Sequence, residues 1–261
     1  MKRLYVSFAL LSALSALLFA ASLWADSSRE WKHYQKAFFE LDRQQAEASG
    51  SLVNPNASGY RISQIIVGDE TRIDRCPTCH LGLEDPRFAD AVQPFKRHPD
   101  IPRHAFEKFG CTICHAGQGL ATTTSDAHGR VPFWEEPLLM GPYLQASCGA
   151  CHMGGVKGAP HLERGRELFQ QSGCLGCHKV RGAGGSLGPD LTRVGNRRQD
   201  PEWHLEHFRD PPSMSPGSMM PPFDFLPEED LTALTVYMLS LRDVPSQLIY
   251  APAGMGQEGK L

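Results

Sequence analysis

The sequence lacks a long run of basic residues and has little excess charge of either sign. Its 26 Lys and Arg residues face 29 Asp and Glu residues, which gives a formal net charge of −3 at pH 7. A weakly acidic surface repels phosphate, so the composition does not indicate nucleic-acid binding. Hydrophobic residues make up 41% of the chain, slightly below the globular norm, while Gly and Pro number 25 and 20. The composition therefore predicts a loop-rich chain whose core is only partly built from side chains.

No cysteine is left over once the cysteines are grouped by spacing. All eight occur as Cys-x-x-Cys pairs, and a histidine directly follows each pair. The four motifs are CPTCH (Cys76, Cys79, His80), CTICH (Cys111, Cys114, His115), CGACH (Cys148, Cys151, His152) and CLGCH (Cys174, Cys177, His178). Two thiols at this spacing can each form a thioether with the same porphyrin, and the adjacent histidine then binds the iron. This pattern is typical of covalent haem c attachment.

Zinc ligation and redox disulfides are other uses of Cys-x-x-Cys pairs. Neither use explains a histidine at the same position after every pair. With 11 histidines among 261 residues, chance supplies one at roughly one site in 24, and at all four sites about three times in a million. The sequence therefore predicts four covalent haem c groups, which would supply apolar surface that the side chains do not.

The N-terminal segment carries Lys2 and Arg3 before a mostly apolar run from Leu4 to Ala25. A run of about 22 residues spans about 33 Å as a helix, which is enough to cross a bilayer core. Two basic residues before the run place the N-terminus in the cytoplasm. We expect a retained single-pass anchor in the bacterial cytoplasmic membrane, with the bulk of the chain in the periplasm. Cleavage after Ser22, as in a signal peptide, is the alternative.

The segment after the anchor has helical periodicity. Residues 26–50 predict a periplasmic stalk helix, with Ser27 or Ser28 as its N-cap. Its apolar stripe consists of Trp31, Tyr34, Phe38 and Leu41. The stripe could bind a partner subunit or pack on the chain's own haem region, and the sequence favours neither reading.

The remaining pattern completes a mainly α, loop-rich organisation. Residues 1–25 form the predicted transmembrane anchor, and residues 51–158 form a three-haem region of short helices and long loops. A short hairpin from Tyr60–Val67 to Thr71–Ile73 is expected before the first motif. Residues 159–243 hold the fourth motif between an amphipathic helix and a final helix that starts near Pro227. Residues 244–261 are expected to form a loose tail.

The segment 159–243 resembles a class I cytochrome c domain. Gly165 and Phe169 on its first helix, with Tyr237 on its last, match the residues through which the two terminal helices of that family cross. Pro189 in GPDL matches the loop proline whose carbonyl orients the proximal histidine. The resemblance implies a class I cytochrome c fold for this segment.

The same resemblance implies a methionine as the second iron ligand of the fourth haem. Met220 in SMMPPF is the predicted ligand opposite His178, and Met219 is the alternative. Met214 matches the family position less well.

The block FKRHPDIPRHAFEKFGCTICHAGQG, with AHG further on, resembles membrane-tethered multihaem cytochromes that serve quinol-oxidising cytochrome bc-type complexes. This resemblance implies a protein that relays electrons from such a complex to a periplasmic acceptor and catalyses no reaction of its own. Its implied partners are the membrane and subunits of the cytochrome b or Rieske type.

Three histidines lie between the first and third motifs, where three haems need a second axial ligand. The predicted ligands are His98, His104 and His128. His33 and His161 are reserves, and His161 is a candidate for the third haem from the following domain. His204 and His207 are expected to face solvent. The sequence does not pair the three histidines with particular haems.

A methionine ligand raises the potential of a haem relative to a second histidine. The ligand sets therefore predict three haems of lower potential followed by one of higher potential.

Two other function classes remain open at this point. A multihaem reductase of a small oxyanion such as nitrite would need an open iron site. A component of an extracellular haem filament is the other, although a membrane anchor argues against it.

Overall fold

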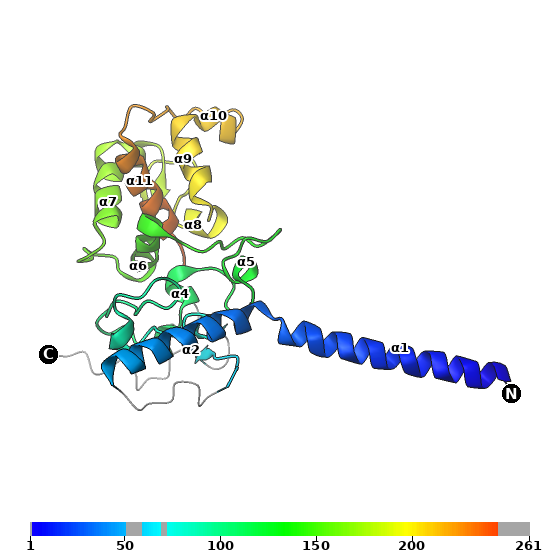
Figure 1. The fold of residues 1–261 in the computed structure, drawn as a ribbon. Coiled ribbons are helices and arrows are strands. Elements are labelled where there is room, and N and C mark those ends of the chain that lie inside the picture. Colours follow the sequence, from blue (N-terminus) through cyan, green and yellow to red (C-terminus); the bar gives the residue numbers. More distant parts are fainter. Residues whose placement is uncertain (1, 51–58, 69–71, 245–261) are drawn as a thin grey trace. The chain divides into compact units, whose positions relative to one another are not determined.

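The structure is a computed structural model that describes residues 2–50, 59–68 and 72–244. The described chain is mainly helical, with short helices joined by loops (Figure 1). It forms two compact units. The N-terminal unit contains Met1–Gln64, Arg75–Asp100 and Thr122–Thr124, and the C-terminal unit contains Ile65–Asp74, Ile101–Ala121 and Ser125–Leu261. The first haem motif belongs to the N-terminal unit, and the other three belong to the C-terminal unit.

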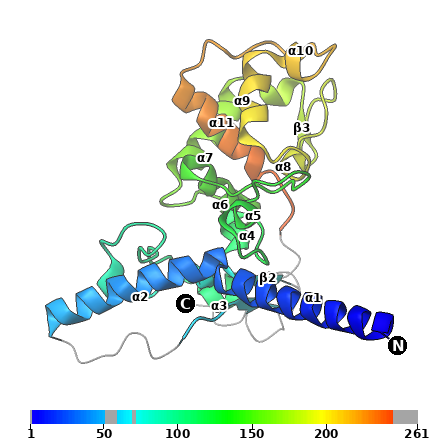
Figure 2. The same cartoon turned by 45° about the vertical axis from the view of Figure 1, so that its right-hand side comes forward.

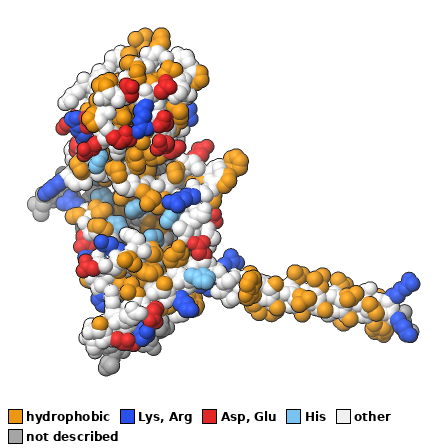
Figure 3. All heavy atoms as spheres, turned by 45° about the horizontal axis from the view of Figure 1, so that its top comes forward, with side chains coloured by type: hydrophobic (Ala, Val, Ile, Leu, Met, Phe, Trp, Pro, Cys, Tyr) orange, Lys and Arg blue, Asp and Glu red, His pale blue; other side chains and the backbone are white. Residues whose placement is uncertain are grey.

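Helix α1 spans Lys2–Ser27 and buries none of its side chains within the chain. It is the one helix of the described residues that is long and apolar enough to cross a membrane. Hydrophobic side chains cover it along its length, with basic side chains at its free end (Figure 3). An apolar helix with nothing packed on it fits a single-pass membrane anchor.

Helix α2 spans Glu30–Ser49 and packs on the chain's own haem region. Its Phe38 ring lies 4.7 Å from that of Phe88 and 5.6 Å from that of Phe95, both in the segment after the first motif. Its buried side chains are Trp31, Gln35, Phe38, Asp42 and Ala46. Of the two readings of the apolar stripe, the structure supports packing within the chain.

The start of α2 differs from the sequence-based expectation. The helix begins at Glu30 after Arg29, and no side chain caps it. The hydroxyls of Ser27 and Ser28 instead donate to the carbonyls of Trp24 and Ala25. Neither serine is free to cap α2 because each bonds back to the last turn of α1.

The predicted hairpin is present. Strand β1 (Ile65–Val67) pairs with the antiparallel strand β2 (Arg72–Asp74), and Ile66 faces Ile73. Residue 71 lies outside the described residues. Short helices follow, as expected: η1 (Cys76–Thr78), η2 (Pro86–Phe88), α3 (Phe106–Phe109), α4 (Thr112–His115), α5 (Thr124–Ala127), η3 (Gly141–Gln145) and α6 (Ala146–Cys151).

Two helices cross at the centre of the segment that follows. Helix α7 (Pro160–Gln171) packs against α11 (Glu228–Ser240), and the two lie side by side in both ribbon views (Figures 1 and 2). Gly165 is buried where they cross, and a methyl group there would overlap the Ala233 carbonyl. The rings of Phe169 and Tyr237 meet edge to face at 5.2 Å. The predicted crossing is confirmed.

Smaller elements complete this segment: η4 (Cys174–Gly176), β3 (Lys179–Val180), β4 (Ala183–Gly184), α8 (Val194–Arg197), α9 (Pro201–Arg209) and α10 (Pro211–Met214). Their apolar side chains join one core with α7 and α11. Its most buried members include Leu168, Phe169, Leu205, Leu231, Leu234 and Met238.

The third haem motif packs on the same two helices. Ala146 at the start of α6 belongs to a buried cluster with Leu162 of α7 and Val236 of α11. A Cβ on Gly149 would lie 2.7 Å from the Ser240 side chain. Helix α6, from the predicted three-haem region, therefore shares a core with the two main helices of the predicted C-terminal domain.

His204 does not face solvent, as the sequence predicted, but lies 2% exposed on the inner side of α9. Its Nε2 hydrogen-bonds to the Arg198 carbonyl at 2.8 Å. Burial lowers its pKa to about 4, so the imidazole is neutral at pH 7. His207 is partly buried, and its Nδ1 has no partner among the described residues.

Candidate haem-binding sites

The four Cys-x-x-Cys-His motifs adopt the same local turn. In each, the backbone N–H of the histidine donates to the carbonyl of the first cysteine. The N···O distances are 3.0 Å for His80 to Cys76, 2.9 Å for His115 to Cys111, 2.8 Å for His152 to Cys148 and 2.9 Å for His178 to Cys174. One helical turn brings side chains three positions apart to the same face, so each pair of thiols lies side by side.

The environment of the thiols suits thioethers better than thiolates. Burial raises the pKa of the Cys79 thiol to about 11, and it raises the pKa values of Cys114, Cys148 and Cys174 as well. Among the residues that the structure describes, no cluster of three or more His, Cys, Asp or Glu side chains could hold a bare metal ion. The residues fit covalent haem attachment.

The first motif is held by a buried amide from α2. Gln35, which is 1% exposed, donates from Nε2 to the carbonyls of Thr78 at 3.0 Å and Arg61 at 2.5 Å. The Thr78 hydroxyl donates to the Ser63 carbonyl at 2.8 Å and accepts from the Ser63 N–H at 3.0 Å. Thr78 lies inside the CPTCH motif, so these bonds fix the motif to α2 and to the strand-like segment before β1.

The second motif rests on a carboxylate that sequence reasoning did not identify. Asp74, at the end of β2, is fully buried and accepts from the N–H groups of Cys111 at 2.5 Å and Thr112 at 2.9 Å. It also accepts from the Thr112 hydroxyl at 2.6 Å, and Arg72 donates to that same hydroxyl oxygen at 2.8 Å. A carboxylate at this position satisfies N–H groups that the first turn of α4 leaves unpaired. No sequence signal links Asp74 to a motif 37 positions away.

The fourth motif shows the contact that the sequence predicted for its histidine. His178 Nδ1 lies 3.0 Å from the carbonyl oxygen of Pro189, a hydrogen bond that fixes the ring and presents Nε2 as the ligand nitrogen. Gly188 stands directly against the ring, because a Cβ there would lie 2.6 Å from its Nδ1. The loop therefore fits closely around the imidazole and fixes its orientation.

The two neighbouring methionines differ in exposure. Met219 is 88% exposed, whereas Met220 packs against the core of α7, α9 and α11. Only Met220 of this pair is directed toward the interior of the segment, which favours it as a ligand.

The predicted distal histidines fall in different units. His98 lies in the N-terminal unit with the first motif, and His104 and His128 lie in the C-terminal unit. Proline carbonyls bind Nδ1 in two of them, Pro99 at 2.7 Å from His98 and Pro102 at 2.9 Å from His104. Carbonyl bonds of this kind commonly orient metal-binding histidines.

The reserve histidines have other surroundings. His33 is exposed on α2. His161, on the first turn of α7, has its Nδ1 3.2 Å from Nε2 of Gln145. The rings of His104 and His152 are brought together, with their centres 6.0 Å apart.

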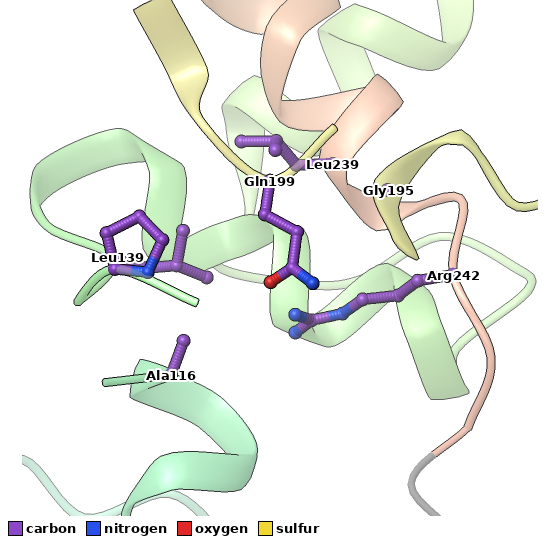
Figure 4. Close-up of a pocket in the computed structure, with 7 residues that line it drawn as sticks. Ala116, Leu139, Gly195, Gln199, Leu239 and Arg242 are labelled. Carbon is purple, nitrogen blue, oxygen red and sulfur yellow. The ribbon is translucent and has the colours of Figure 1, made fainter. Parts of the chain in front are cut away.

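An arginine lies between the second and third motifs. Arg242, just after α11, donates to the Ser147 hydroxyl at 2.8 Å, and that hydroxyl donates to the Cys114 carbonyl at 2.5 Å. Its side chain and that of Gln199 point into a small pocket (Figure 4). Burial lowers its pKa, and its Nε has no hydrogen-bond partner among the described residues. A partly buried cation with an unused donor fits a carboxylate such as a haem propionate.

Known proteins resemble part of the chain. Residues 183–244, which include Pro189 and Met220, match the family described as "Cytochrome C oxidase, mono-heme subunit/FixO". A cytochrome c oxidase subunit 2 from Alkalihalophilus pseudofirmus is 37% identical over 86 residues, which cover 30% of this chain and 25% of that protein. The subunit 2 of Bacillus sp. (strain PS3) is 35% identical over 97 residues, 32% of this chain and 27% of that protein.

The chain therefore spans about a quarter of the length of the curated relatives it matches. The family match supports haem binding and indicates one haem. Together with α1, these similarities support a cytochrome c-type protein that is associated with a membrane and takes part in electron transfer.

Proposed function

We propose that this chain is a tetrahaem c-type cytochrome, anchored by α1, that carries electrons from a quinol-oxidising membrane complex to a periplasmic acceptor. The observation that carries the proposal is the shared turn of the four motifs, in which each histidine N–H bonds to the first cysteine carbonyl. Four copies of one attachment geometry imply four copies of one group. The chain itself catalyses no reaction in this proposal.

Each bound haem would supply an iron that takes up and releases one electron. The residues of this chain would hold it and set its potential. The proposed proximal ligands are His80, His115, His152 and His178, and the proposed distal ligands are His98, His104, His128 and Met220. Methionine raises the potential relative to histidine, so the His178–Met220 site has the highest potential of the four.

The haem count is tested by mass spectrometry of the intact, detergent-purified protein. Four covalent haems per chain are expected. Replacing both cysteines of one motif with alanine should remove one haem and leave three. A wild-type protein with a single haem, on the fourth motif, would refute the tetrahaem proposal.

The electron-relay role is tested by redox titration and by carbon monoxide. Four one-electron steps are expected, with the His178 site highest, and the ferrous protein should not bind carbon monoxide rapidly because all four irons have two protein ligands. A His178 site with the lowest potential would refute the proposed direction. Rapid carbon monoxide binding would favour a reductase with an open site.

A second candidate places the chain with a terminal oxidase, because the similar proteins are named as cytochrome c oxidase subunits. Purification in mild detergent distinguishes the two. Cytochrome b or Rieske-type subunits that co-purify with the chain would support the quinol-oxidising complex. Copper-containing oxidase subunits would support the second candidate instead.

A further inference from the structure

Two histidines of the C-terminal unit, His104 and His152, lie close together. His152 ends the third motif, directly after α6, and His104 precedes α3 by one residue. Their ring centres lie 6.0 Å apart, and their planes are inclined by 46°. The Phe109 ring, at the end of α3, lies 4.7 Å from the His104 ring and packs against it.

This separation matches two imidazoles bound to opposite sides of one iron. A metal–nitrogen bond of about 2 Å on each side, plus roughly 1.1 Å from each nitrogen to its ring centre, gives about 6.2 Å. Stacked imidazoles would be closer, so the pair leaves room for an iron between the two rings.

A bare metal ion does not explain the pair. The described residues contain no third His, Cys, Asp or Glu side chain that would complete such a site with these two. A porphyrin supplies four nitrogens around the iron, so a haem needs only the two axial ligands that the chain provides. The third motif holds the two thiols for that porphyrin directly before His152.

The hydrogen bonds of His104 set the correct tautomer. Nδ1 of His104 lies 2.9 Å from the Pro102 carbonyl, so its proton is on Nδ1 and Nε2 carries the lone pair. We infer that His104 is the distal ligand of the third haem, opposite His152. This inference rests on the proposed function and deepens it, because the sequence left the three distal histidines unpaired with their haems.

The competing ligand for the third haem, His161, has the opposite tautomer. The side-chain amide oxygen of Gln145, Oε1, accepts from the backbone N–H groups of His161 at 2.8 Å and Leu162 at 3.3 Å, which fixes the orientation of the amide. Its Nε2 therefore donates to His161 Nδ1 at 3.2 Å. The imidazole proton then lies on His161 Nε2, so this nitrogen has no lone pair for an iron.

The test uses the full-length protein in detergent and two matched variants, His104→Met and His161→Met. Electron paramagnetic resonance of the oxidised protein and a redox titration are recorded for each. His104→Met should convert one bis-histidine low-spin signal to a histidine–methionine signal and raise the potential of one haem. His161→Met should change neither.

Assignment to the third haem comes from combining His104→Met with alanine at Cys148 and Cys151. Without the third attachment site, His104→Met should have no further spectral effect. A persisting effect would assign His104 to another haem and overturn the inference, as would an altered signal in His161→Met. A wild-type protein without haem on the third motif would instead refute the proposed function, which mass spectrometry shows independently.

A second variant, His104→Gly, tests the same ligand by removing the imidazole altogether. Removal of the imidazole should leave one iron open, so that one ferrous haem per chain gains carbon monoxide binding. Added imidazole should restore the low-spin spectrum and abolish that binding. Unchanged carbon monoxide binding in a correctly folded His104→Gly protein would overturn the inference.

Discussion

Replacing Gly165 with alanine sets two effects of opposite sign against each other. Gly165 lies inside α7, where alanine is favoured over glycine by about 1 kcal/mol. At the crossing with α11, however, the added methyl would overlap the Ala233 carbonyl and lie 2.8 Å from Tyr237 Cβ. The carbonyl belongs to helix backbone and cannot rotate away, so the two helices must separate.

The expected net effect is destabilisation. Overpacking of a tight core costs typically about 1–3 kcal/mol. Separation of the helices also weakens the edge-to-face contact of Phe169 with Tyr237, which is worth about 0.5–1.5 kcal/mol. After the gain in helix propensity, we expect a loss of about 2 kcal/mol, or roughly 30-fold in the ratio of folded to unfolded protein.

Denaturant titration of the purified full-length chain measures this loss, followed through the haem absorption. Gly154→Ala is the control in the same unit, because a Cβ at Gly154 meets nothing within 4 Å. The control should stay within about 0.5 kcal/mol of the wild type. If Gly165→Ala proves as stable as the wild type or more so, helix propensity has won, and the tight crossing is refuted.

Three further predictions concern single side chains. Because the folded-state pKa of His204 is about 4 instead of 6.5, the unfolded chain takes up a proton first, and stability should fall by about 3 kcal/mol between pH 6.5 and pH 4. His204→Gln should make the free energy of unfolding depend less on pH, as measured by denaturant titrations at several pH values. Asp200, Arg198 and His207 contribute smaller effects to the pKa of His204. A variant whose stability falls with pH as steeply as that of the wild type would contradict this prediction. Met220→Leu should abolish the methionine–iron absorption and lower the potential of one haem, whereas Met219→Leu should change neither, and the reverse result would exchange their roles. Asp74→Asn should destabilise the protein by about 2 kcal/mol in thermal unfolding. The carboxylate accepts three hydrogen bonds, whereas the asparagine amide has one oxygen, which is a weaker acceptor, and one nitrogen, which cannot accept. Unchanged stability would show that the carboxylate charge is not needed.

Local sequence carried enough information for the features that depend on neighbouring residues. The haem motifs, the hairpin before the first of them and the Pro189 contact to His178 all involve short spans of chain. The crossing at Gly165 was predictable because a resemblance supplied the partner helix.

Features that depend on distant residues were not predictable. Asp74 serves Cys111, 37 positions away, and nothing in its neighbourhood indicates that partner. The predicted apolar stripe of the helix after the anchor contained only aromatic and leucine side chains, and the polar Gln35 was not part of it. Gln35 is nevertheless buried, because two backbone carbonyls accept the protons of its side-chain amide. His204 was predicted to face solvent, but the Arg198 carbonyl satisfies its imidazole inside the core.

The packing of α6 on α7 and α11 has a consequence for the passage of electrons. Electrons tunnel between haems at rates that fall steeply with distance. A distance that fluctuates between two haems would therefore make the rate of electron transfer fluctuate as well. Gly149 and Ala146 of the third motif's helix lie against Ser240 and Leu162 in a closely packed interior, not at the end of a linker. Interiors packed in this way resist compression. These contacts therefore hold the third motif against the two main helices beside the fourth motif, and substitutions there should alter the rate of transfer between the proposed third and fourth haems without touching any ligand.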